Sequence, residues 1–130
     1  MAPKFRAWLK EEKRMTDVHE MTFIDGEVYL ISDVTDFYAY DEFKLMQSTG
    51  LRDKNGRESY EGDIVKYKYG VNTFTEVVTY DKDFAGFGLV DDDGYGSTVF
   101  TFGELAEDVD FSSLEVAGNI YENPELLKGK

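Results

Sequence analysis

The sequence contains no cysteine, one histidine and only two prolines. Without cysteine the chain can form no disulfide, no cysteine-ligated zinc site and no thiol nucleophile. Cysteine-free chains suit an intracellular setting, so we expect a cytoplasmic protein. No apolar run approaches the ~20 residues that a membrane helix needs, and the first residues lack the apolar stretch of a signal peptide. We therefore expect no membrane association.

Basic residues are scarce, and their distribution is uneven. The chain carries 27 acidic and 14 basic residues, a net charge of −13. Residues 81–125 hold 12 acids and a single base, Lys82, whereas the first 80 residues have a net charge of only −4. A field of one sign repels phosphate, so direct nucleic-acid binding is not expected.

The acids of the second half predict a negative surface that could bind a basic partner. The alternative is that they only keep the protein soluble. The predicted surface consists of Asp81, Asp83, Asp91, Asp92, Asp93, Glu104, Glu107, Asp108 and Asp110.

Patterns typical of catalysis and metal binding are also missing. His19 is flanked by Asp17 and Glu20, but nothing in the sequence marks a reacting partner for it. Residues 53–56 and 91–94 resemble calcium loops, yet the twelfth loop position holds Gly62 in one and Phe100 in the other, where an EF-hand needs glutamate. No glycine-rich loop leads into a helix start with Lys and Ser or Thr. We expect no enzymatic activity, no catalytic residue, no metal and no cofactor.

Aromatic residues are abundant, with 9 Tyr and 10 Phe, and they favour strands. Residues 4–9 alternate as a strand does, and Asp25-Gly26 between two apolar runs predicts a hairpin. Alternation over residues 63–118 predicts a bent antiparallel sheet that closes towards a barrel. The side chains predicted to point inward are Val65, Tyr67, Val78, Tyr80, Phe87, Phe100, Leu114 and Val116.

The chain is expected to end in a short helix at residues 123–127, with Asn123 as the N-cap and Pro124 in the first turn. The predicted fold class is therefore α+β, mainly β, with a bent antiparallel sheet, an SH3-like barrel part in the second half and a short C-terminal helix. We divide the chain into a strand-rich N-terminal subdomain, residues 1–46, and a barrel subdomain, residues 47–130, within one compact unit.

A stretch near the middle, residues 45–66, carries the densest set of turn signals. Asn55-Gly56 tolerates positive φ and predicts a tight turn, and Gly62-Asp63 leads into an alternating strand. Glycines in this stretch would supply turns, while Leu51, Tyr60 and Ile64 with Val65 would anchor the loop to the core.

This stretch resembles the central motif of the YopX family, small proteins encoded by phages and prophages. The matching residues are Leu45, Met46, Gln47, Ser48, Thr49, Gly50, Leu51, Asp53, Asn55, Gly56, Tyr60, Glu61, Gly62, Asp63, Ile64 and Val65. Residues 4–8 resemble the opening of the family and residues 118–127 its close. Ser59 stands where the family often has an apolar residue, which raises the question of whether its side chain is buried. The resemblance implies an α+β, mostly strand fold with an SH3-like part, and no activity, cofactor or catalytic residue.

Three function classes remain open. The first is a non-enzymatic interaction or self-assembling module in the host cytoplasm, where a homo-oligomer would cover the apolar surface and strand edges of so aromatic a chain. The second is an acidic mimic of nucleic acid that blocks a host DNA-binding protein. An enzyme that uses carboxylates and a divalent metal is the weakest alternative, because no ligand spacing stands out.

Overall fold

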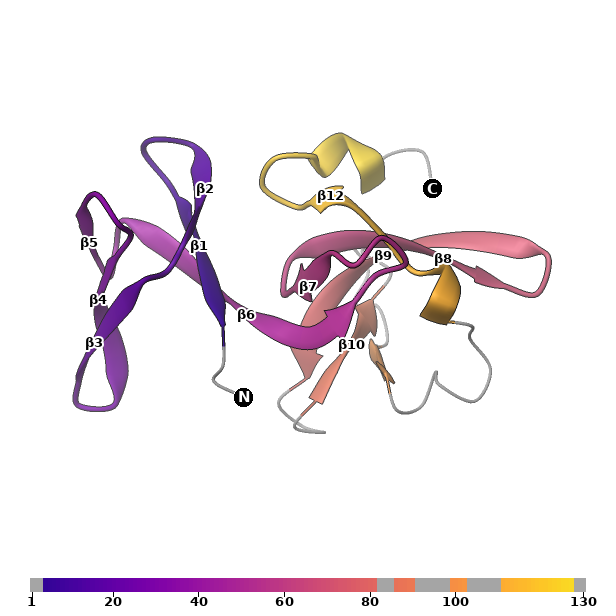
Figure 1. Cartoon of the computed structure of the whole chain (residues 1–130), viewed down its shortest axis with the longest axis horizontal. Helices are drawn as coiled ribbons and strands as arrows, with labels where there is room; N and C mark the ends of the chain where they lie inside the picture. Colours follow the sequence, from indigo (N-terminus) through magenta and orange to yellow (C-terminus); the bar gives the residue numbers. More distant parts are fainter. Residues whose placement is uncertain (1–3, 82–85, 91–98, 103–110, 128–130) are drawn as a thin grey trace. The chain divides into compact units, whose positions relative to one another are not determined.

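The computed structural model describes residues 4–81, 86–90, 99–102 and 111–127. The chain forms two compact units, Met1–Ser48 and Thr49–Lys130. The division predicted from the sequence lies two residues earlier. Each unit has its own core, and one long strand, Phe43–Arg52, runs from the first unit into the second (Figure 1).

The first unit consists of short antiparallel strands in two sheets. β1 (Phe5–Leu9) lies between β2 (Arg14–Asp17) and the first part of β6 (Phe43–Arg52). β4 (Glu27–Ser32) lies between β3 (Glu20–Ile24) and β5 (Phe37–Ala39). The predicted hairpin turn is confirmed: Asp25 has φ 52° and Gly26 φ 82°, the pair of positive values that a type I′ turn requires.

The core of the first unit lies between its two sheets. Its buried side chains come from both: Ala7, Leu9, Ile31, Tyr38 and Phe43. Met21 and Val28 pack against this cluster from β3 and β4, so one side of the β3–β4–β5 sheet faces the core.

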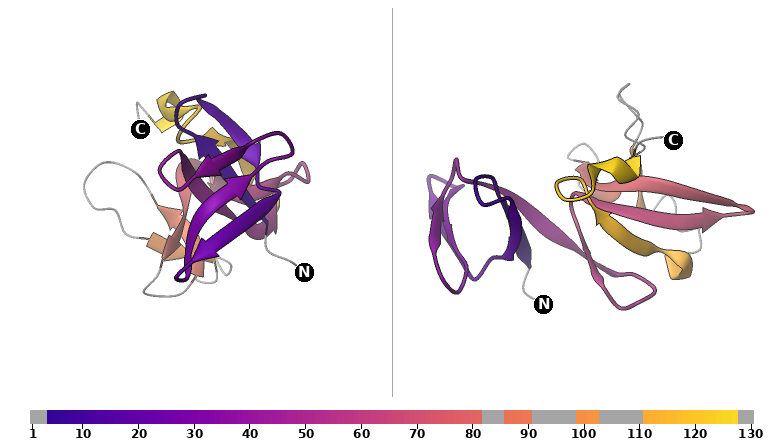
Figure 2. Two further views of the ribbon diagram at one scale, coloured as in Figure 1. Left: turned by 90° about the vertical axis from the view of Figure 1, so that its left-hand side faces the viewer. Right: turned by 90° about the horizontal axis from the view of Figure 1, so that it is seen from above.

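The second unit is a curled antiparallel sheet in the order β11-β10-β9-β8-β12 (Figures 1 and 2). Its strands are β8 (Asp63–Tyr69), β9 (Asn72–Asp81), β10 (Gly86–Val90), β11 (Val99–Thr101) and β12 (Glu115–Asn119). β7 (Glu58–Tyr60) lies beside the last residues of β6. The predicted bent antiparallel sheet is confirmed, whereas closure into an SH3-like barrel stays a prediction.

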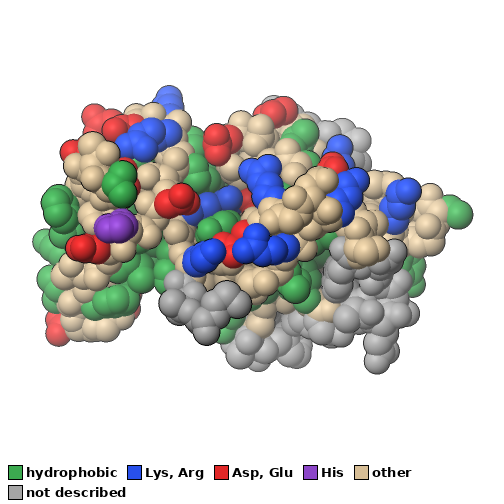
Figure 3. Space-filling model, viewed as in Figure 1, with side chains coloured by type: hydrophobic (Ala, Val, Ile, Leu, Met, Phe, Trp, Pro, Cys, Tyr) green, Lys and Arg blue, Asp and Glu red, His purple; other side chains and the backbone are tan. Residues whose placement is uncertain are grey.

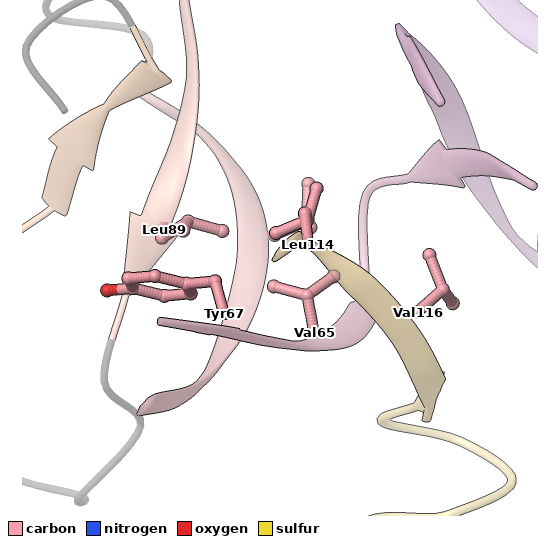
Figure 4. Close-up of a cluster of buried hydrophobic side chains, with 6 residues drawn as sticks. Val65, Tyr67, Leu89, Leu114 and Val116 are labelled. Atoms are coloured by element: carbon pink, nitrogen blue, oxygen red, sulfur yellow. The ribbon is translucent and has the colours of Figure 1, made fainter. Parts of the chain in front are cut away.

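The inner face of this sheet holds the core of the second unit (Figure 4). Its members are Val65, Tyr67, Val78, Leu89, Leu114 and Val116. The alternation therefore predicted most of the core and missed Leu89. Tyr80, expected inward, is 45% exposed and meets Phe87 edge to face at 5.3 Å, because it lies beyond the buried cluster. The side chain of Phe100 lies outside the described residues.

The expected C-terminal helix is wrong in type. Pro124–Leu127 forms one turn of 3-10 helix, as does Phe111–Ser113, and the described residues contain no longer helix. Four residues are too few to offset the cost of starting an α-helix. Asn123, the expected N-cap, instead accepts a hydrogen bond from the backbone N–H of Asn119 through its side-chain oxygen, at 3.2 Å.

Residues 45–51, where Gly50 was expected to supply a turn, are part of β6. Gly50 interrupts the regular strand with φ 83° rather than ending it. The structure thus extends one strand where the sequence predicted a loop.

Candidate functional site

The central motif folds around the carboxylate of Asp53, which is only 7% exposed. One oxygen accepts hydrogen bonds from the backbone N–H groups of Asn55 (2.9 Å) and Arg57 (2.8 Å). The other accepts from the N–H of Val116 on β12, also at 2.9 Å. Burial raises the pKa of Asp53, but the donors from Val116, Arg57 and Asn55, with the charge of Arg57, outweigh it and hold this pKa below its ordinary value.

A second polar group in the motif joins β6 to β7. Ser59 is fully buried, and its hydroxyl donates to the carbonyl of Leu51 at 2.9 Å. The hydroxyl of Thr49 hydrogen-bonds to the Ser59 hydroxyl and accepts from the N–H of Leu51. The question raised by the sequence is thereby answered: this position is buried, and hydrogen bonds compensate for its polar atom.

The remaining motif residues form the turn into β8. Gly56 (φ 79°) and Gly62 (φ 84°) adopt the left-handed conformation that the turn prediction required. Asp63 is buried and accepts from the N–H of Tyr60 at 2.8 Å. Ile64 and Val65 are fully buried, as expected, but Leu51 is exposed and does not anchor the loop. Glu61 is half-buried. The motif therefore has a structural role, because its polar groups satisfy its own backbone.

The acidic surface predicted for the second half lies outside the described residues. This applies to Asp83, Asp91, Asp92, Asp93, Glu104, Glu107, Asp108 and Asp110 in full, and to the side chain of Asp81. Whether these acids share one face stays a prediction.

A pocket of about 450 Å³ in the first unit borders β2 and the turn between β4 and β5, and the exposed His19 lies in its wall. Asp33 in this wall has a pKa held at about 2 by the N–H groups of Asp36 and Thr35, aided by Thr16 and Arg14. Four donors already occupy its oxygens, so Asp33 acts as a structural carboxylate. Among the described residues, no three potential ligands gather that could hold a metal ion.

Exposed aromatic side chains are the more distinctive feature of the first unit. Phe23 is 56%, Tyr29 45% and Tyr40 61% exposed, and the rings of Tyr29 and Tyr40 lie 5.6 Å apart. We call these three residues the aromatic face. Hydrophobic side chains gather over β3–β5 in Figure 3.

The aromatic face continues the core side of the β3–β4–β5 sheet. Phe23 pairs with Val28, which packs on the core, and follows the core contact Met21 by two positions. Tyr40 likewise follows the buried Tyr38 by two positions. Since alternate residues of a strand share a side, the apolar side of this sheet extends beyond the part that the unit itself covers.

The chain segment that carries this face is acidic. Residues 15–43 contain eight acids and no Lys or Arg. Asp25 and Glu27 belong to the hairpin next to Phe23, and Asp41 follows Tyr40. All three are exposed, and none forms an ion pair within the part of the chain that the structure describes. We call Asp25, Glu27 and Asp41 the acidic rim.

The second unit presents a surface of opposite character at the end of the β8–β9 hairpin. Val71 is 100% exposed, Tyr69 and Phe74 are partly exposed, and their rings meet edge to face at 6.4 Å. Lys66 and Lys68 are exposed on β8, and residues 64–75 contain no acid. We call these five residues the basic hairpin tip. The hairpin projects from its sheet in Figure 2, and a hydrophobic side chain with basic neighbours marks its end in Figure 3.

Sequence reasoning missed both surfaces. It predicted Tyr67 and Tyr80 to point inward, which holds for Tyr67 alone, and it made no use of the exposed Tyr69 and Phe74. The absence of any base from residues 15–43 was the signal available for the first surface, and the run of two lysines and exposed apolar residues in 66–74 was the signal for the second.

Comparison with known proteins identifies relatives of the whole chain. The crystal structure of protein EF1440 from Enterococcus faecalis is 31% identical, with a TM-score of 0.68, covering 98% of this chain and 99% of the other. The crystal structure of protein yopX from Bacillus subtilis is 19% identical, with a TM-score of 0.64, covering 96% and 98% respectively, and it shows the shared fold. None of the curated proteins matches.

The described residues contain no helix with the length and apolarity needed to span a membrane. The model of the YopX protein family matches residues 4–128, from the first strand to the C-terminal 3-10 turn. The structural relatives span the same length. The chain therefore belongs to the YopX protein family, as its central motif indicated.

Proposed function

We propose that this protein is a non-enzymatic protein-binding module, a phage or prophage accessory protein that acts in the host cytoplasm. Its aromatic face would bind an extended segment that carries both apolar and basic side chains. The observation that carries this proposal is an exposed aromatic patch on a segment, residues 15–43, whose charged side chains are all acidic apart from His19.

The size of the aromatic face supports a binding role. A fully buried aromatic side chain covers about 150–250 Å², so the exposed fractions of Phe23, Tyr29 and Tyr40 leave roughly 250–400 Å² to be covered. At ~25 cal/mol per Å² this burial contributes about 6–10 kcal/mol before the cost of association, which is itself about 4–15 kcal/mol. The face alone therefore supports weak binding, and further contacts must add to it.

Two features supply those contacts. The acidic rim attracts a basic partner and speeds its approach, an effect that salt weakens. β3 is an edge strand of its sheet, so its outer backbone groups can accept an added strand from a partner. A partner strand with alternating basic and apolar residues satisfies both requirements.

The test uses a defined probe, a short synthetic peptide that alternates Lys and Val, with a peptide that alternates Glu and Val as its control. We expect the Lys peptide to shift amide resonances of β3, β4 and β5 in ¹H–¹⁵N spectra, and more weakly at high salt. Y40D should abolish these shifts. V34D adds the same charge at an exposed position at the opposite end of the sheet and should not affect them. Shifts confined to other strands, or equal losses in Y40D and V34D, would contradict the proposal.

A further inference from the structure

We propose that the natural occupant of the aromatic face is the basic hairpin tip of a second copy of this chain. The two surfaces would join head to tail, the first unit of one copy with the second unit of another. This inference rests on the proposed function, because it names the partner of the same surface.

The two surfaces are complementary in chemistry. The aromatic face offers Phe23 and Tyr40 next to the acidic rim, in a segment, residues 15–43, that carries eight acids and no Lys or Arg. The hairpin tip offers Val71, fully exposed, with the exposed Lys68 and Lys66 further along β8, and residues 64–75 carry no acid. Apolar side chains would meet at the centre of this contact and opposite charges at its rim, which is the usual anatomy of a protein interface.

The end of the hairpin extends past the described strands that flank it. β10 pairs with β9 only from Val77 onward, and β12 pairs with β8 only as far as Lys66. Within the described residues, the outer edge of β9 at residues 72–74 therefore has no strand beside it. An edge of this kind can add to the free edge of β3, and its alternate residues would then extend the aromatic side of that sheet.

Symmetric pairing of identical surfaces is disfavoured by the same charges. Two aromatic faces would bring acidic rim against acidic rim, and two hairpin tips would bring lysine against lysine. When the aromatic face of one copy binds the hairpin tip of another, the dimer still has one free aromatic face and one free hairpin tip. Further copies can therefore add to it unless the arrangement closes into a ring.

A complementation experiment tests this arrangement. Y40D removes the aromatic face and V71D removes the hairpin tip, and both change exposed side chains. We expect the unaltered chain to exceed 14.9 kDa in sedimentation velocity as concentration rises, and less so at high salt. Each variant alone should self-associate at least tenfold more weakly. Their equimolar mixture should form a dimer that grows no further, since it contains one intact surface of each kind.

V34D is the matched control and should associate as the unaltered chain does. The inference is overturned if the unaltered chain stays at 14.9 kDa throughout, if V34D dissociates as Y40D does, or if the mixture does not dimerise. A monomer that still binds the Lys–Val peptide would leave the proposed function standing, with another protein as partner. If the unaltered chain is a monomer and V71D strengthens binding of the Lys–Val peptide, the aromatic face is occupied by the hairpin tip of the same chain, and the inference of a second copy is overturned. Failure of self-association and peptide binding together would remove both proposals.

Discussion

Replacing Asp53 with asparagine should cost the second unit about 3–5 kcal/mol of free energy of unfolding. The side-chain amide of asparagine keeps one acceptor oxygen, which can face the two donors within the loop. Its NH₂ group then faces the N–H of Val116, so that bond, worth ~1.5–3 kcal/mol with a charged acceptor, is lost. The other two bonds lose their charge, at about 1 kcal/mol each. The total is large for a single substitution.

The effect should depend on pH in a defined direction. Since the pKa of Asp53 is lowered in the folded state, its charge stabilises the fold above the unfolded pKa of about 3.9. That contribution is lost as pH falls through the lower folded pKa. The difference between D53N and the unaltered chain should therefore be constant near neutral pH and shrink below about pH 4.

Urea denaturation followed by amide resonances of β8 and β12 measures this difference. E125Q is the control, because Glu125 is exposed, and it should change stability by no more than ~0.5 kcal/mol. A cost for D53N below about 1 kcal/mol, or one that does not change between neutral and acidic pH, would refute the role given to the carboxylate.

Three further substitutions test other parts of the structure. S59A should lower stability by about 1–3 kcal/mol in the same urea experiment, since it removes the buried hydroxyl that donates to the carbonyl of Leu51 and hydrogen-bonds to the hydroxyl of Thr49. G118A should lower the melting temperature in calorimetry, by the equivalent of about 1–3 kcal/mol, because its Cβ would lie 2.4 Å from the side-chain oxygen of Asn123. Replacing Asp91, Asp92 and Asp93 with asparagine should weaken the binding of basic proteins to a column that carries the immobilised protein. Unchanged binding with the same salt dependence would show that these three acids are not part of the contact.

The features that sequence predicted are those set by neighbouring residues. Asp25-Gly26 defines its turn through two backbone angles, and the alternation of Val65 and Tyr67 defines which side of the sheet is buried. The contact between Asp53 and Val116 joins residues 63 positions apart, and no local pattern indicates it.

The candidate site was harder to predict for a different reason. Alternation places Tyr40 on the same side as Tyr38, but it does not show how far the covering sheet extends. The net charge of the first 80 residues also conceals the acidic segment 15–43. Bases before and after this segment bring that net charge to only −4. The segment after residue 80 carries more acids, so the acidic binding surface was predicted in the second half of the chain.

The bond from Asp53 to β12 bears on the order in which the chain can fold during synthesis. All strands of the first unit, up to Ser48, are made early and can pair while the rest is still being translated. The loop of the second unit must wait for Val116, and β8 lacks one neighbour until Asn119 has left the ribosome. The first unit, with its aromatic face, would therefore fold while the second sheet is still incomplete, and any binding at that face could begin on the nascent chain.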